Sequence, residues 1–359
     1  MAGLYGCSSG TDEQPLPDWT GKTDTLSSTE LHPLSSDSTL LHVSEFVALD
    51  NRYVCLSQPG IDDQLWNLYE LKGDSLIRMG NFIRNGKGPK EVLSRAYLTV
   101  RDDGSLLIAP NGYNTHFFIS DKHPDSILNP HSWKTFNYPR TNSYLGMVRP
   151  LGKNGYILPS STGGLDYLYE RFTVGDSIFT GTNSPFPERE SECSNLSKSM
   201  AYKVQLYRRP GEDRYVSVAY FGDWVTIFNV EGDSITRKKS ILNTPPTFTL
   251  REDGINIRYD DENSMGFLAA VTEDYIYLFK HLIKYGDFGH ILEYKGYPAT
   301  YSDEIWVYDW EGNPVRRFIL DVPVAMIGTD PQDQFLYAAL IDPETSDQRI
   351  LRFALPKME

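Results

Sequence analysis

A pattern that recurs six times along the chain constrains its fold more than any other feature. Each copy has a short apolar segment, a turn rich in Asp, Asn, Gly or Lys, and a second segment that opens with an aromatic residue or Leu. The residues that open the second segments are Tyr53, Leu106, Tyr156, Tyr215, Tyr275 and Phe335. They are separated by 53, 50, 59, 60 and 60 residues. Repeats of about 50 residues are typical of the blades of a β-propeller.

Each copy can be extended into a four-stranded antiparallel sheet. A third segment with strand character follows each anchor, at residues 66–71, 116–120, 167–174, 224–230, 305–310 and 350–355. In four copies a Gly-Asp-Ser or Gly-Asn-Pro turn comes next, at Gly73, Gly175, Gly232 and Gly312. Gly and Asp adopt the backbone angles that tight hairpins require. The sequence therefore predicts an all-β fold, a six-bladed β-propeller of four-stranded antiparallel blades.

The sixth copy ends at Glu359, directly after its third strand, so its blade needs an outer strand from elsewhere. Residues 28–34 precede the first copy, and we predict that they supply this strand and close the ring. The chain then divides into an N-terminal tether, residues 1–27, and a single propeller domain, residues 28–359. The fifth copy also carries an insertion at residues 280–303, which we interpret as either a binding loop or a packing loop.

The tether carries a signal of its own. The order Leu4-Tyr5-Gly6-Cys7 resembles the lipobox of bacterial lipoproteins, in which the cysteine is acylated, and a polar stretch at residues 8–18 follows it. The charged and apolar regions of a signal peptide do not precede Cys7, and the alternative is a chance tetrapeptide. We predict lipidation at Cys7, which would anchor the protein in the cell envelope, in the periplasm or on the outer-membrane surface.

Charge and composition exclude several classes of partner. The chain has 34 basic and 48 acidic residues and a net charge of −14, which argues against nucleic acid or an anionic membrane surface as a partner. The longest apolar run, around residues 266–271, is far shorter than the ~20 residues that span a bilayer. Cys7, Cys55 and Cys193 are too few and too scattered for a disulfide framework or a Cys-based zinc site.

The most specific local motif is the string Gly86-Lys87-Gly88-Pro89-Lys90-Glu91, directly before the first strand of the second copy. Together with the repeats, which cover residues 43–355, this Gly-x-Gly-Pro-x-Glu string resembles the TolB-like six-bladed propeller family, common among envelope lipoproteins of Gram-negative bacteria. That family usually has Gly before the Glu and Phe after it, where this chain has Lys90 and Val92. The resemblance implies an extracytoplasmic propeller. It does not identify any residue of this chain as catalytic.

Basic residues gather around this motif in an otherwise acidic chain, and later inner strands add more. If they converge on the mouth of a central channel, they can bind a carboxylate, or a sulfated or uronic sugar, through paired hydrogen bonds. The alternative, which we favour, is a set of internal ion pairs with acids such as Asp102 and Asp103. The candidate ligand-binding residues are Arg84, Lys87, Lys90, Glu91, Arg95, Arg149 and Arg209.

Catalytic motifs are not found in the sequence. It contains no His-Glu-x-x-His, Gly-x-Ser-x-Gly or phosphate-loop pattern, so no catalytic residue is assigned. We expect a non-catalytic, monomeric envelope lipoprotein without a cofactor that binds a protein or glycan partner. The alternative is a calcium-dependent hydrolase or lactonase with its site in the central channel. Acidic stretches at Asp62-Asp63 and Asp260-Asp261-Glu262 are the calcium candidates, with no defined set of metal ligands.

Overall fold

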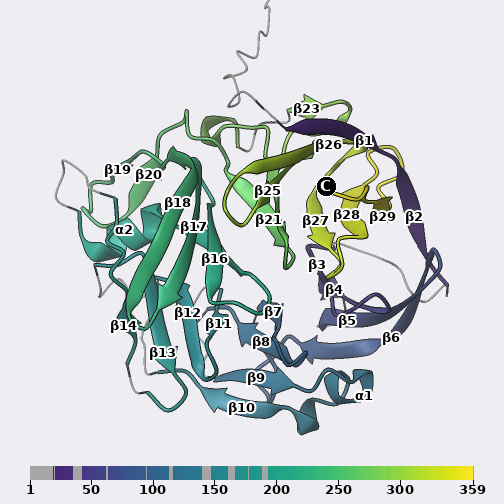
Figure 1. Cartoon of the computed structure of the whole chain (residues 1–359), viewed down its shortest axis with the longest axis horizontal. Helices are drawn as coiled ribbons and strands as arrows, with labels where there is room; N and C mark the ends of the chain where they lie inside the picture. Colours follow the sequence, from purple (N-terminus) through teal and green to yellow (C-terminus); the bar gives the residue numbers. More distant parts are fainter. Residues whose placement is uncertain are drawn as a thin grey trace, which may run out of the picture.

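The computed structural model places six blades around a central axis, so the predicted all-β six-bladed propeller is confirmed (Figure 1). The lipidation candidate Cys7 and the calcium candidates Asp62 and Asp63 lie outside the described part of the chain. The structure describes residues 19, 21–34, 43–61, 64–93, 95–112, 116–139, 147–160, 166–176, 178–187, 193–288, 290 and 292–358.

The first three blades are antiparallel sheets whose strands follow one another in the chain from the axis outward. Blade 1 is β3 (Glu45–Ala48), β4 (Tyr53–Ile61), β5 (Gln64–Lys72) and β6 (Ser75–Arg84). Blade 2 is β7 (Ala96–Val100), β8 (Leu106–Pro110), β9 (His116–Ser120) and β10 (Lys134–Asn137). Blade 3 is β11 (Arg149–Leu151), β12 (Gly155–Pro159), β13 (Tyr169–Thr173) and β14 (Thr180–Gly181).

The last three blades follow the same order from the axis outward, and the sixth takes its outer strand from the N-terminal region. Blade 4 is β15 (Val204–Arg208), β16 (Arg214–Ala219), β17 (Asp223–Glu231) and β18 (Ser234–Thr244). Blade 5 contains β21 (Phe267–Val271), β22 (Tyr275–Lys280), β25 (Ser302–Asp309) and β26 (Pro314–Val324). Blade 6 is β27 (Met326–Thr329), β28 (Phe335–Ile341), β29 (Gln348–Ala354) and β2 (Ser28–Pro33).

Strand β2 closes the ring as the sequence predicts. It runs antiparallel to β29, with Ser28 opposite Phe353 and Leu31 opposite Ile350. At its C-terminal end, β2 also pairs in parallel with β6 of blade 1. There the backbone N–H of His32 donates to the carbonyl of Asp74 at 2.8 Å. A single N-terminal strand therefore joins the last blade to the first.

A second N-terminal strand extends the propeller beyond the predicted boundary. Strand β1 (Lys22–Leu26) lies parallel to β26 and forms a fifth, outermost strand of blade 5. Asp24 pairs with Arg316 at 3.0 Å, and Leu26 is buried in the core between blades 5 and 6. Residues 22–26, which the sequence boundary assigns to the tether, therefore belong to the propeller.

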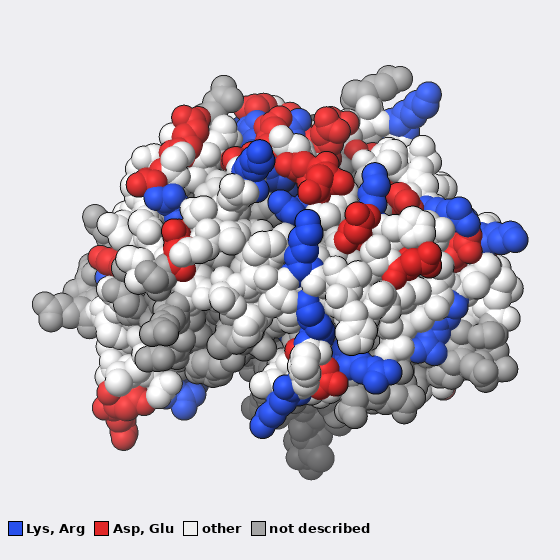
Figure 2. Space-filling model, turned by 90° about the horizontal axis from the view of Figure 1, so that it is seen from below, with Lys and Arg blue, Asp and Glu red and all other residues white. Residues whose placement is uncertain are grey.

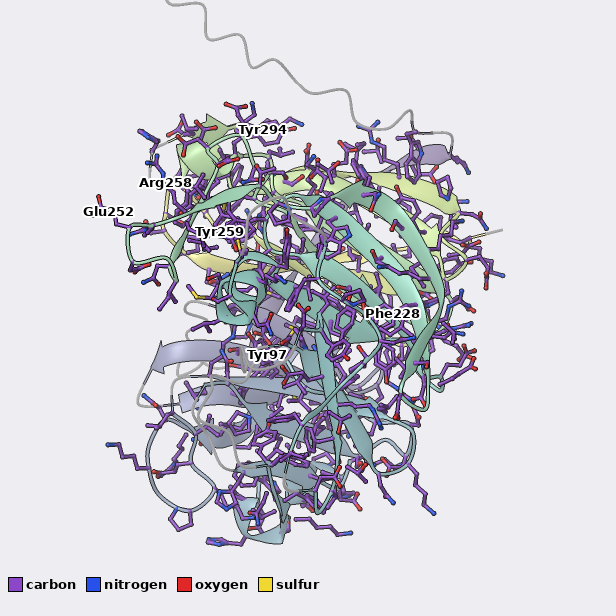
Figure 3. All side chains as sticks on the ribbon, turned by 90° about the vertical axis from the view of Figure 1, so that its left-hand side faces the viewer. Tyr97, Phe228, Glu252, Arg258, Tyr259 and Tyr294 are labelled. Atoms are coloured by element: carbon purple, nitrogen blue, oxygen red, sulfur yellow. The ribbon has the colours of Figure 1, made fainter. Side chains whose placement is uncertain are left out.

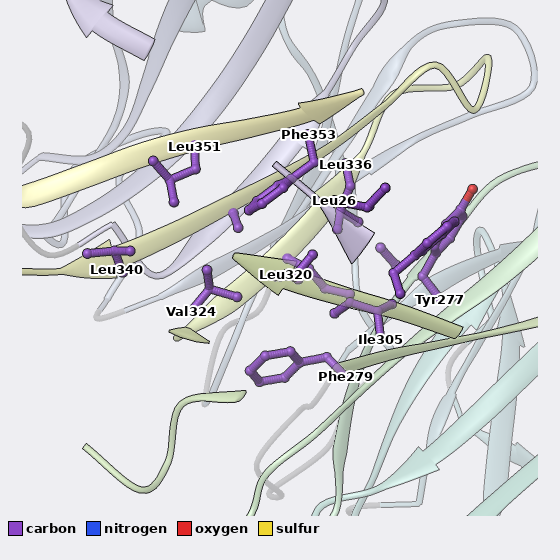
Figure 4. Packing of buried hydrophobic residues seen from close by; sticks show 14 of the residues in the cluster. Leu26, Tyr277, Phe279, Ile305, Leu320, Val324, Leu336, Leu340, Leu351 and Phe353 are labelled. Carbon is purple, nitrogen blue, oxygen red and sulfur yellow. The ribbon is translucent and has the colours of Figure 1, made fainter. Parts of the chain in front are cut away.

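Apolar side chains between adjacent blades form the core. Figure 4 shows this packing between blades 5 and 6, where Tyr277 and Ile305 face Leu336 and Phe353, with Leu26 of β1 beside them. The hairpins that connect the strands use left-handed glycines at the predicted turns, for example Gly73 and Gly232, both with φ of 60°. The helices of the described ranges lack the length and apolar character needed to cross a membrane.

The two ends of the propeller axis differ in their loops. In antiparallel blades arranged in a ring, every inner strand begins at the same end. At that end the chain carries insertions that include α2 (Asn195–Ala201), the hairpin β19–β20 (Phe248–Leu250, Ile257–Tyr259), η2 (Tyr285–Asp287), and β23–β24 (Glu293–Tyr294, Tyr297–Pro298). We call this end the insertion face. Figure 3 shows Arg258, Tyr259 and Tyr294 on one side of the molecule and Phe228 on the other. The segments α1 (Pro124–Ile127) and η1 (Pro130–Ser132) connect β9 to β10 at the opposite face.

Candidate functional site

The Gly-x-Gly-Pro-x-Glu string folds into a turn that holds its own carboxylate. The Oε2 atom of Glu91 accepts a hydrogen bond from the backbone N–H of Gly88 at 2.7 Å. A Cβ atom on Gly86 or Gly88 would lie 2.0 Å or 2.8 Å from that oxygen, so only glycine leaves room for it. Glu91 therefore stabilises the turn that leads from blade 1 into blade 2.

Lys90 is turned toward the outer half of blade 2. Its Nζ donates to the carbonyl of Trp133 at 2.7 Å and to the hydroxyl of Thr135, and it lies 5.1 Å from the ring centroid of Phe118. Burial lowers the pKa of Lys90. Its partners belong to the outer strand of blade 2 and the segment before it, so Lys90 does not line the axis.

Arg84 and Lys87 also lie away from the axis. Arg84 ends β6, the outer strand of blade 1, and both side chains are exposed. The edge of the molecule seen in Figure 2 carries a column of basic side chains with acidic side chains near it. The part of the predicted basic cluster that comes from residues 84–90 thus lies around the outer strands of blades 1 and 2, away from the axis.

Arg209 lies in the turn between β15 and β16, at the end of the axis opposite the insertion face. Its Nε donates to the carbonyl of Glu273 at 2.7 Å, and its guanidinium lies 6.0 Å from the ring centroid of Trp310. Arg209 therefore connects blade 4 to blade 5. The neighbouring Arg208 pairs with Asp102 through two hydrogen bonds of 2.6 and 2.9 Å, the kind of internal ion pair that the sequence favours.

Arg95 is one of two predicted residues that do reach the axis. It directly precedes β7, and its Nε and Nη2 both donate to Oε1 of Glu45, the first residue of β3. Burial raises the pKa of Glu45, although the charges of Arg95 and Arg149 oppose this shift. Burial alone would lower the pKa of Arg95, but the charge of Glu45 raises it overall. The guanidinium of Arg95 also lies 4.9 Å from the ring centroid of Tyr97.

Arg149 is the second predicted residue at the axis, and it is almost completely buried, with 6% of its surface exposed. Its Nε donates to the carbonyl of Leu206 on β15 at 2.7 Å, and its Nη1 donates to the hydroxyl of Thr99 on β7 at 2.8 Å. Among the described residues, the hydrogen-bond acceptor of its Nη2 is the thioether sulfur of Met147, at 3.4 Å. Among the described residues no carboxylate lies within 4.0 Å of this guanidinium. Burial lowers the pKa of Arg149.

Two tyrosines from blade 4 complete the surroundings of the arginines. The guanidinium of Arg149 lies 5.9 Å from the ring centroid of Tyr207. The Tyr207 hydroxyl donates to Gln205 at 2.6 Å, and burial raises its pKa to about 12. Tyr220 is hydrogen-bonded to Tyr97, and burial raises its pKa, with further contributions from Tyr97 and Tyr207.

These side chains form one group, which we call the axial cluster. It draws on blades 1 to 4. Glu45 and Arg149 open their inner strands and Arg95 directly precedes one, whereas Tyr207 lies near the end of β15. It contains two guanidinium groups and one carboxylate, so it carries a net charge of +1 in a protein of net charge −14. Its members are Glu45, Arg95, Tyr97, Arg149, Tyr207 and Tyr220.

Glu45 and the three tyrosines are the members that sequence reasoning missed. Glu45 opens the inner strand of the first copy, as Arg149 opens that of the third. A polar residue at the start of an inner strand is therefore a signal that could have found Glu45. Tyr220 directly follows a second strand, and only the packing of the blades brings it to the axis.

Exposed large apolar side chains concentrate on the insertion face. Of twelve such residues in the described ranges, nine lie on loops or strand ends at this face. Phe288 is the second most exposed of the twelve, with 63% of its surface accessible. The nine residues are Leu34, Leu93, Tyr167, Leu196, Ile255, Leu282, Phe288, Leu292 and Ile341.

The calcium alternative gains no support from the described part of the chain. No group of three or more His, Cys, Asp or Glu side chains in that part is arranged to hold a metal ion. In the acidic stretch at residues 260–262, Asp261 pairs with Arg258 at 3.6 Å and Glu262 pairs with Lys284 at 2.6 Å. These acids are thus engaged in surface ion pairs.

Comparison with known proteins agrees with this architecture. The family model described as TolB-like 6-blade propeller-like matches residues 43–331. The chain belongs to the TolB-like six-bladed propeller family. No curated protein sequence matches this TolB-like propeller significantly.

Two solved structures share the fold of this TolB-like propeller. A member of the DUF4221 family from Bacteroides vulgatus has 9% identity and a TM-score of 0.56, over 94% of this chain and 98% of that one. A predicted exported protein from Bacteroides fragilis has 12% identity and a TM-score of 0.53, over 94% of this chain and 99% of that one. At these identities the likeness concerns the fold alone.

Proposed function

We propose that this TolB-like propeller is a non-catalytic binding protein of the bacterial cell envelope that engages a protein or glycan partner through its insertion face. The observation that carries the proposal is the concentration of nine of the twelve exposed large apolar side chains on this one face. Isolated apolar side chains are common on any surface, whereas a concentration on one face is typical of an interaction site.

The insertions support this role because they brace one another. The hydroxyl of Tyr259 on β20 donates to the carbonyls of Met200 and Ala201 on α2, at 2.8 and 2.9 Å. Ser197 of α2 donates to the carbonyl of Ile255 at 2.7 Å. Exposed apolar residues such as Ile255 are therefore presented from a fixed scaffold, which lowers the entropy lost on binding.

The insertion at residues 280–303 is joined to the same scaffold. The rings of Tyr259 and Tyr285 have centroids 5.3 Å apart. Within the insertion, Tyr294 donates to Asp303 at 2.9 Å, and His281 Nδ1 lies 2.9 Å from the carbonyl oxygen of Thr300. These contacts hold the insertion in place, and Phe288, which it carries, is 63% exposed and available to a partner.

The proposal also includes the location and state of the protein. The family and the exported Bacteroides protein of the same fold support a place outside the cytoplasm. We expect an anchor at Cys7, a monomer, and binding without a cofactor. Lipidation would hold the propeller at a membrane and leave the insertion face available to its partner.

The test compares two double variants that remove the same kind of side chain from opposite faces. Ile255→Ser with Phe288→Ser alters the insertion face, and Val174→Ser with Ile178→Ser alters exposed apolar residues on the opposite face. Binding of the purified full chain to fractionated envelope proteins and to a glycan array is measured by biolayer interferometry. We expect the first variant to lose about tenfold or more in affinity and the second to match the unaltered protein. Equal binding by all three proteins, or an equal loss in both variants, would refute the proposal.

A further inference from the structure

The charges of the axial cluster do not balance among the residues that the structure describes. Glu45 neutralises Arg95, with which it forms two hydrogen bonds, and this leaves the charge of Arg149 without a carboxylate within 4.0 Å among the described residues. A buried cation is costly unless an anion lies close to it. Arg149 is 6% exposed, and the acceptors of its hydrogen bonds are carbonyl, hydroxyl and thioether groups, all of them neutral.

Within the described part of the chain, both guanidinium groups also have donors without a strong acceptor. Arg149 directs Nη2 at the sulfur of Met147, which is a weak acceptor. Arg95 uses Nε and Nη2 for Glu45, and its side chain remains 45% exposed. Guanidinium groups with free donors bind carboxylates well, because the planar N–H groups match the two oxygens.

The tyrosines beside the two arginines indicate what kind of molecule could carry a carboxylate to them. Tyr97 and Tyr207 each place an aromatic ring beside one of the arginines, at 4.9 and 5.9 Å from the guanidinium carbon. Tyr220 adds a phenol that is hydrogen-bonded to Tyr97. Aromatic rings with hydroxyl groups suit a ligand that has an apolar face and a polar edge, as a sugar ring has.

We propose that the axial cluster binds the carboxylate of a sugar acid, with Arg149 and Arg95 as its donors and the tyrosines against the sugar ring. The net charge of +1 matches a monoanion. This inference rests on the proposed function, because it specifies the ligand chemistry recognised at the centre of the insertion face.

A purely structural role for Arg149 is the competing explanation, since its hydrogen bonds connect the inner strands of blades 2, 3 and 4. Two variants with opposite expected effects separate the roles. Arg149→Met removes the unbalanced charge and should abolish or weaken anion binding. Glu45→Gln removes the internal carboxylate, frees Arg95 and raises the charge of the cluster, so it should strengthen anion binding. A structural role predicts no gain from Glu45→Gln.

The experiment is isothermal titration of the full chain at pH 7 and low salt with sodium glucuronate, with glucose as the uncharged counterpart and sodium acetate as the carboxylate without a ring. We expect glucuronate to bind more tightly than acetate, and glucose not to bind. Arg149→Met should weaken glucuronate binding by about tenfold or more, and Glu45→Gln should strengthen it by a similar factor. Arg209→Met removes the same charge at the opposite face and should leave binding unchanged.

Several outcomes would overturn the inference. These are glucose binding as tightly as glucuronate, no glucuronate binding by the unaltered protein, unchanged binding by a folded Arg149→Met variant, or weaker binding by Glu45→Gln. Equal affinity for acetate and glucuronate would overturn the assignment of a sugar acid. If glucuronate fails to bind while the insertion-face variants still lose their partner, this inference fails and the proposed function stands. If glucuronate binds while those variants keep their partner, the proposed function fails instead.

Discussion

Replacing Asp333 with Asn should stabilise the propeller at neutral pH, and the gain should shrink toward pH 4. Asp333 lies in the turn between β27 and β28 of blade 6, and it accepts a hydrogen bond from the hydroxyl of Tyr277 of blade 5 at 2.7 Å. Burial raises its pKa to about 6, and the nearby charges of Asp274 and Asp330 contribute to this shift. Asn keeps an acceptor for Tyr277 and tolerates the left-handed φ of 55° at this position.

The direction of the pH dependence follows from proton uptake. Between the ordinary carboxyl pKa of 3.8 and the native value of about 6, the folded protein binds more protons at Asp333 than the unfolded chain does. Stability therefore falls as the pH rises through this interval. The full difference corresponds to about 3 kcal/mol, and solvent screening of this half-buried group reduces it to about 1–2 kcal/mol. Asn does not titrate, so the variant should recover this amount above pH 7.

The assay is urea-induced unfolding of both proteins between pH 4 and pH 8, followed by tryptophan fluorescence. Asp342→Asn is a control that should change the free energy of unfolding in the opposite direction. Backbone N–H groups of Glu344 and Thr345 donate to Asp342 and lower its pKa, so its ionised form stabilises the fold. That variant should lose stability at every pH from 4 to 8, because the lowered pKa keeps Asp342 ionised in the folded protein over this whole range. The reasoning is refuted if Asp333→Asn shows no gain at pH 8, or if its gain at pH 4 is as large as that at pH 8.

Two further predictions concern the closure of the ring and the entry into blade 5. Leu26→Ala should lower the free energy of unfolding by about 2–3 kcal/mol, because Leu26 of β1 is buried between blades 5 and 6. The control Thr23→Ala, on the exposed face of β1, should change it little. Equal losses for the two variants in urea titrations would show that the side chain of Leu26 adds nothing to the core. Gly266→Ala should lower the melting temperature much more than Gly254→Ala. Both glycines have positive φ, but a Cβ at Gly266 would lie 2.3 Å from the carbonyl oxygen of Ala219, while a Cβ at Gly254 would meet nothing within 4 Å. Similar melting temperatures for the two variants would contradict this.

The number and position of the blades were predictable because each blade is specified locally. An apolar segment, a turn of Gly and Asp and a second apolar segment stand next to one another in the chain, and the same order recurs six times. The role of strand β2 could be predicted from the number of strands, since the sixth repeat supplies only three and its blade needs a fourth, outer strand. Strand β1 could not be found this way, because Lys-Thr-Asp-Thr-Leu is a polar edge strand with one buried residue, Leu26.

The candidate site was only partly predictable, because neighbours in sequence are not neighbours in space at the axis of a propeller. Arg84, Lys87 and Lys90 cluster along the chain, yet they lie around the outer strands of blades 1 and 2. The sequence by itself determined the repeat, the turns and the ring, because short-range patterns of apolar and turn residues specify them. Only the tertiary structure decided that Glu45, Arg95 and Arg149, each about one blade apart in sequence, share one environment. The physical reason is that ring closure brings the starts of all inner strands to one end of the axis, where contacts across blades set the charge balance.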